Sequence, residues 1–169
     1  KGYYCSVIAI LMLFLELSKE DSEKWISKIL GTIDLIPDIA KTTKQWYESE
    51  KEELKRFKNI IVIGYDKCLP AATEGALKIL ETVQCCVRYY ELEEFMHGIY
   101  HGIDKSTLIL ALGNQSRHLN RMVRLLGYLK EHKNATTYLI SQNKVTKHDF
   151  SYPFIEDSLF VSFEYLTVL

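Results

Sequence analysis

The sequence has few cysteines and no dense cluster of positive charge, and each shortage excludes a class of protein. Its cysteines, Cys5, Cys68, Cys85 and Cys86, match neither a disulfide framework nor the CxxC spacing of a zinc site. The formal net charge is −1, and lysine and arginine are scattered, which argues against nucleic acid as a partner. We therefore expect a reduced, cytoplasmic protein without a bound metal.

The chain also lacks an apolar run long enough to cross a membrane. The stretch from Val7 to Leu15 is the longest candidate, and a spanning helix needs ~20 apolar residues. It could serve as a signal-peptide core, but Glu16 and Lys19 follow where a small-residue cleavage site would lie. We expect a buried helix over residues 2–18 and no membrane partner. Because no initiator Met opens the chain and an apolar run closes it, we also expect a piece of a longer protein.

Residues 1–58 are predicted to form a helical segment that precedes the main domain. Asp21 and Ser22 are N-cap candidates for a long helical region over residues 23–57, which we expect Pro37 to interrupt. The chain has 169 residues, of which 47% are hydrophobic, enough for one buried core. We predict a helical connector over residues 1–58, formed by the end of a preceding domain, and a second domain over residues 59–169.

From residue 59 onward, strand and helix patterns alternate. Apolar, often β-branched runs predict strands at residues 60–63, 85–90, 107–111, 136–140 and 159–162, and helices are predicted at residues 70–84 and 117–132. Such alternation indicates a parallel sheet covered on both faces. The fold class expected is α/β, a three-layer α/β/α sandwich around a five-stranded, doubly wound, flavodoxin-like parallel sheet.

One predicted helix carries charges at helical spacing. Glu74, Lys78 and Glu81 fall on a single face, and the next strand leads to an acidic segment that ends at His97. Carboxylates with an imidazole suit acid/base chemistry on a small polar substrate. The alternative is a solvated helix face with ordinary ion pairs, the usual role of such charges.

These motifs resemble the sugar isomerase (SIS) domain family. The matching runs are EGALKILE at residues 74–81, EFMHG at residues 94–98 and KGY at residues 1–3. The likeness is to the second SIS domain of glucosamine-6-phosphate synthase and to fructosamine-6-phosphate deglycases and other phosphosugar isomerases. It covers most of the chain. It implies a sugar-phosphate ligand, a homodimer and no organic cofactor.

The resemblance also implies catalytic roles. The glutamate at the position of Glu81 moves the proton between C1 and C2 of the open-chain sugar, with Lys78 beside it. Glu74 matches a glutamate that contacts the sugar or holds the geometry of the site. His97 matches a histidine that assists ring opening, in the synthase within the neighbouring subunit's site. Here Ile99 replaces the proline that follows the His-Gly pair in the family.

The loops that follow the first and third predicted strands are poor candidates for a phosphate-binding site. The loop after the first strand carries Asp66, which would repel phosphate, whereas Ser116 begins a helix after the third strand and is the better substrate-binding candidate. Lys1 belongs to the stretch that closes the first SIS domain in relatives and is a second candidate. In two-domain relatives the phosphate lies on that first domain.

We therefore expect a fragment of a phosphosugar isomerase, aminotransferase or deglycase, inactive by itself, acting on a ketose or amino-sugar 6-phosphate. The alternative is a non-catalytic SIS domain that senses sugar phosphates or dimerises within a regulator.

Overall fold

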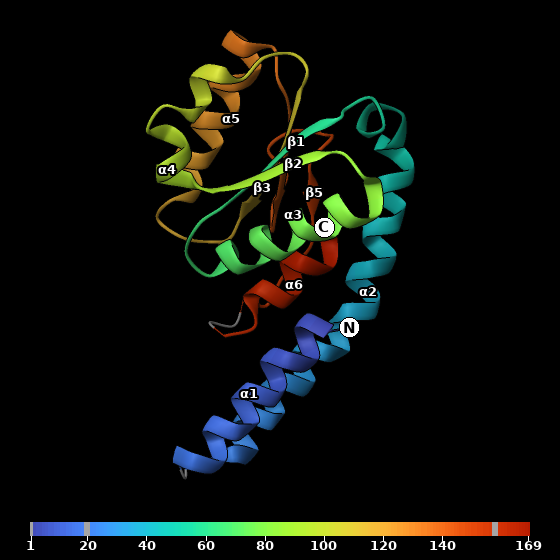
Figure 1. Ribbon diagram of the computed structural model, residues 1–169. Helices are drawn as coiled ribbons and strands as arrows, with labels where there is room; N and C mark the ends of the chain where they lie inside the picture. Colours follow the sequence, from blue (N-terminus) through green and yellow to red (C-terminus); the bar gives the residue numbers. More distant parts are fainter. Residues whose placement is uncertain (1, 19–20, 157–158) are drawn as a thin grey trace.

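The computed structural model describes residues 2–18, 21–156 and 159–169. They form a helical hairpin that extends from a three-layer α/β/α body (Figure 1). The hairpin consists of α1 (Gly2–Ser18) and the first half of α2 (Ser22–Leu54), and the second half of α2 lies against the body.

Helix α2 begins as predicted but is not interrupted. The Asp21 carboxylate accepts hydrogen bonds from the backbone N–H groups of Glu23 and Lys24, which makes it the N-cap. Pro37 lies inside the helix, so the expected break there is wrong. Proline removes one backbone donor but keeps a helical φ, and tertiary contacts of the two residues that follow it hold the helix against the body. Ile39 is fully buried, and Asp38 accepts a hydrogen bond from the Tyr152 hydroxyl at 2.8 Å.

Helix α1 forms as predicted, but its expected burial is wrong. Leu15 is its buried residue, whereas Ile10, Leu13, Phe14 and Leu17 are 56%, 61%, 64% and 70% exposed. The helix is apolar on all sides, yet it packs on one side, against residues of α2 and the start of the last helix. One neighbouring layer cannot cover a helix that is apolar all round.

The sheet is parallel, with the order β2-β1-β3-β4-β5. Its strands are β1 (Asn59–Gly64), β2 (Cys86–Glu91), β3 (Thr107–Gly113), β4 (Thr136–Ser141) and β5 (Phe150–Ser151). The first four agree with the sequence prediction, and β1 and β3 are almost entirely buried, as expected for apolar runs between two helical layers. This is the predicted doubly wound α/β architecture.

The fifth strand is not the predicted one. Residues 159–162 were expected to form it, but Val161 begins α6 (Val161–Val168), and the fifth strand is the short β5. Helix α6 is buried nearly all round. A short apolar run does not distinguish a buried strand from a buried helix, which explains the error.

Helices cover both faces of the sheet (Figure 1). On one face lie α2, α3 (Leu69–Val83) and α6, and on the other lie α4 (Leu92–Met96) and α5 (Leu119–Lys133). Short 3-10 turns, η1 (Asp66–Cys68) and η2 (Ile99–Gly102), complete the connections. A Cβ atom on Gly75 of α3 would collide with Leu169, so glycine at that position permits the close approach of α6.

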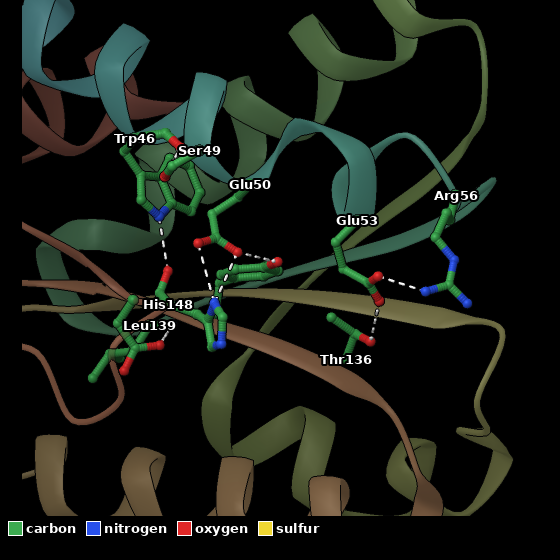
Figure 2. Close-up of polar contacts among 10 residues, drawn as sticks. Trp46, Ser49, Glu50, Glu53, Arg56, Thr136, Leu139 and His148 are labelled. Atoms are coloured by element: carbon green, nitrogen blue, oxygen red, sulfur yellow. Dashed lines mark hydrogen bonds and ion pairs between the residues drawn. The ribbon is translucent and has the colours of Figure 1, made fainter.

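Polar contacts fix the second half of α2 to the β4 side of the sheet (Figure 2). The Glu50 carboxylate accepts a hydrogen bond from the Tyr138 hydroxyl at 3.1 Å and lies 3.1 Å from Nδ1 of His148. Trp46 Nε1 donates to the carbonyl of His148 at 2.8 Å. These bonds, together with the buried Phe57, join the helical segment to the sheet.

Candidate functional site

A crevice opens at the carboxyl ends of β1 and β3. The chain winds outward from these two neighbouring strands in opposite directions, toward β2 and toward β4, so the crevice lies at a topological switch point. Doubly wound sheets bind ligands at this point. The hollow here has a volume of about 520 Å³. Its lining residues come from the turns after both strands, from the segment before α6 and from the first residue of α6: Asp66, Lys67, Asn114, Gln115, Ser116, Glu156 and Val161.

Two buried tyrosines hold residues of this crevice in place. The Tyr65 hydroxyl donates to the carbonyl of Asn114 at 2.7 Å, which ties the turn after β1 to the turn after β3. The Tyr165 hydroxyl, on α6, donates to Glu156 at 2.7 Å and lies 3.2 Å from the carbonyl of Gly113. Burial raises the pKa of both phenols well above the ordinary value, so both remain protonated donors.

Glu156 reaches into the crevice from the segment that precedes α6. Its carboxylate accepts a hydrogen bond from the backbone N–H of Gln115 at 2.9 Å. Its own backbone N–H donates to the carboxylate of the fully buried Glu164 at 3.1 Å. Glu156 also has a positive φ of 55°, a conformation that few non-glycine residues adopt. Sequence reasoning missed both glutamates, because no local pattern around residues 156 and 164 indicates a site.

Ser116 lies in the predicted place but forms a local bond. It lines the crevice, and its hydroxyl oxygen accepts a hydrogen bond from the backbone N–H of His118 at 3.1 Å, just before α5. Its contact with a substrate stays a prediction. The other substrate-binding candidate, Lys1, lies outside the described residues.

The predicted charged face of α3 forms as expected from its spacing. Nζ of Lys78 lies 2.8 Å from the Glu81 carboxylate and 3.4 Å from that of Glu74. The side chains of Lys78 and Glu81 are 48% and 51% exposed, whereas that of Glu74 is 19% exposed. The hydrogen bond to Glu81 raises the pKa of Lys78. This face opens outward and does not line the crevice.

His97 lies far from this face within one chain. It follows α4, whose Leu92 and Phe95 pack on the opposite side of the sheet from α3. Glu81 is in the last turn of α3, which runs back from the carboxyl end of β1, whereas His97 comes just after the carboxyl end of β2. The structure of the single chain thus brings Glu74, Lys78 and Glu81 together but not His97.

A second cavity, of about 510 Å³, lies between α2 and the sheet. Its walls are mainly apolar, with Trp46, Leu54 and Phe57 among them, and it has no pair of acid and base groups for catalysis. Among residues 2–18, 21–156 and 159–169, no group of three His, Cys, Asp or Glu side chains is arranged to hold a metal ion. Over the same residues, no helix combines the length and apolarity needed to span a bilayer.

The fold and its crevice define a doubly wound α/β domain of the ligand-binding type. A family model described as the SIS domain matches residues 53–147, more than half of the chain. The chain therefore belongs to the SIS domain family, as the motifs indicated.

Similar proteins support this assignment. A structure from Salmonella typhimurium LT2, provisionally named a sugar binding protein, has a TM-score of 0.85 and 29% identity over 99% of this chain and 54% of its own. A structure from Clostridium difficile 630, provisionally named a phosphosugar isomerase, has a TM-score of 0.84 and 30% identity over 99% of this chain and 49% of its own.

A curated relative is glutamine–fructose-6-phosphate aminotransferase (isomerizing) of Wigglesworthia glossinidia brevipalpis. It is 26% identical over 150 residues, which are 86% of this chain and 24% of the relative. The chain thus spans about half of the two solved structures and about a quarter of this relative.

Proposed function

We propose that this chain is the second SIS domain of a phosphosugar isomerase-type enzyme. The enzyme would move a proton between C1 and C2 of a ketose or amino-sugar 6-phosphate. Similar proteins named phosphosugar isomerase and isomerizing aminotransferase support this choice. In this proposal residues 1–58 connect the domain to a preceding SIS domain, and the 169 residues alone are inactive.

One observation carries the proposal: a single lysine joins two carboxylates on an open helix face. Lys78 pairs with both Glu74 and Glu81, so one ammonium group holds the two carboxylates side by side on the helix. A carboxylate within reach of a bound sugar can take the proton from C1 or C2 and return it to the neighbouring carbon. Glu81 is the proposed base, Lys78 orients a sugar hydroxyl, and the less exposed Glu74 positions Lys78.

The proposal requires a second chain. Because His97 is remote from Glu81 within one chain, ring opening by His97 would occur in the site of a partner subunit, which makes the active form a homodimer. His97 is exposed on the turn after α4, which leaves its side chain open to a second chain.

The phosphate would bind to the preceding domain, together with the candidate Lys1. The crevice of this domain presents the carboxylates of Asp66 and Glu156, and carboxylates repel phosphate. The same argument disfavours the alternative, a sensor domain without turnover, because a sensor needs its own phosphate grip. Free thiols at Cys5, Cys68, Cys85 and Cys86 fit a cytoplasmic location.

The test is Glu81→Gln in the full-length protein. Candidate hexose 6-phosphates are incubated in deuterated water, and proton NMR measures exchange at C1 and C2. Loss of a general base should lower the exchange rate by about 10²-fold or more. Glu131→Gln, a substitution of the same kind at an exposed site on α5, serves as the control. A Glu81→Gln rate within about tenfold of the wild type contradicts the proposal.

A further inference from the structure

The carboxylate of Glu156 lies where the crevice would otherwise offer a donor to an anion. It is bonded to the backbone N–H of Gln115, in the turn between β3 and α5. In doubly wound folds, backbone N–H groups between a parallel strand and the next helix bind phosphate oxygens. In this chain, that donor is already satisfied by a side chain of the same molecule.

Several contacts hold Glu156 in place. The phenol of Tyr165, which is fully buried, donates to the second carboxylate oxygen, and the buried Glu164 accepts a bond from the backbone of Glu156. The positive φ of Glu156 turns the chain so that its side chain and its N–H reach different partners. An arrangement fixed from both the side chain and the main chain is a built part of the crevice.

The other charges around the crevice also disfavour an anion. Asp66 also lines the hollow, and Lys67 is the one cationic side chain among the described lining residues. A phosphate entering the crevice would have to displace Glu156 from Gln115 and would still face Asp66. It would gain one hydrogen bond, but the negative charges of both carboxylates would repel it.

We propose that Glu156 is an internal occupant of the anion position and that it determines which ligands this crevice rejects. The wild-type crevice excludes phosphate groups, and removal of the Glu156 carboxylate turns it into a phosphate site. This role is independent of proton transfer by Glu81, because the two residues lie on different surfaces.

The experiment titrates the chain with inorganic phosphate, against sodium chloride at equal ionic strength, and follows the backbone amide signals of Gln115 and Ser116 by NMR. Glu156→Ala vacates the position, and Glu156→Gln removes the charge while keeping the shape. Glu131→Ala changes the net charge equally at an exposed site on α5 and is the matched control. We expect saturable phosphate binding by Glu156→Ala, at least about tenfold tighter than by the wild type or the control, with Glu156→Gln between them.

Two results would overturn the inference. One is wild-type binding of phosphate at Gln115 with the affinity of Glu156→Ala. The other is a folded Glu156 variant that still fails to bind; if Glu156→Ala does not fold, the isosteric Glu156→Gln decides. Binding of phosphate by the wild-type crevice would also remove the argument that phosphate binds to the preceding domain. Failure of the proposed base is distinguishable, because it would appear as unchanged C1/C2 exchange in Glu81→Gln.

Discussion

The α3 face and the crevice use the same kinds of residue in opposite ways. On α3, Glu74 and Glu81 share Lys78 in contact with solvent. In the crevice, Glu156 is bound to a phenol and to a backbone amide, and its own N–H donates to the fully buried Glu164. The first set is open to an incoming molecule, and the second is already engaged with its own chain.

The difference follows from solvent access. Exposed ion pairs contribute little to stability, because water solvates the separated charges nearly as well. Such side chains can therefore contact a substrate with almost no loss of folding stability. A buried carboxylate, by contrast, needs a hydrogen-bond donor for its oxygens, and losing one leaves an unsatisfied charge. Residue type alone therefore does not distinguish a catalytic acid from a structural one.

The largest expected effect tests whether Glu81 and His97 act across a dimer. In the full-length protein, Glu81→Gln and His97→Asn should each lower C1/C2 exchange strongly. Dimers re-formed from an equal mixture should regain about a quarter of the wild-type rate, since half of them are mixed and each holds one intact site. Remixing either variant with itself is the control. No recovery in the mixture would contradict action between subunits.

The next effect concerns the stability of the crevice. Tyr165→Phe removes the hydroxyl that donates to Glu156, so the free energy of unfolding should fall by about 1–3 kcal/mol. Urea unfolding followed by circular dichroism measures the change. Tyr128→Phe, at a 39% exposed position on α5, is the matched control and should keep the wild-type midpoint. Equal midpoints for both variants would show that the network is not a structural support.

A smaller effect appears at alkaline pH. Burial, with the charge of Glu156 as a further cause, raises the pKa of Tyr165 above its unfolded value of 10.0. Its contribution is complete below pH 10 and is lost as the pH rises, because the unfolded tyrosine ionises first. The free energy of unfolding should fall by about 1 kcal/mol per pH unit above 10 for this group. Urea unfolding between pH 8 and 11 measures the slope, which Tyr165→Phe should reduce; an unchanged slope contradicts the assignment.

The smallest effect is expected on the α3 face. Lys78→Met removes both exposed ion pairs, and the midpoint of urea unfolding should stay at the wild-type value. A destabilisation as large as that of Tyr165→Phe would show that this face is covered in the assembled protein, and the contrast between the two regions would then fail.

Much of the fold was predictable from local pattern. The apolar runs before Gly64 and Gly113 are buried on both faces, so nearly continuous hydrophobicity was a sufficient signal for β1 and β3. The spacing of Glu74, Lys78 and Glu81 likewise predicted a shared helix face. Strand β5 has two residues, too few to show a strand pattern in the sequence. The apolar run at residues 159–162, where the fifth strand was predicted, instead leads into the buried helix α6.

By itself, the sequence determined the alternation of strands and helices, the SIS family motifs and the charged face of α3, because each depends on residues within a few turns of one another. Only the tertiary structure decided that α1 stays largely exposed, that His97 lies apart from Glu81, and that Glu156 meets Gln115 across 41 positions of the chain. Such contacts arise where strand ends and distant loops converge in space, and no local spacing records that convergence.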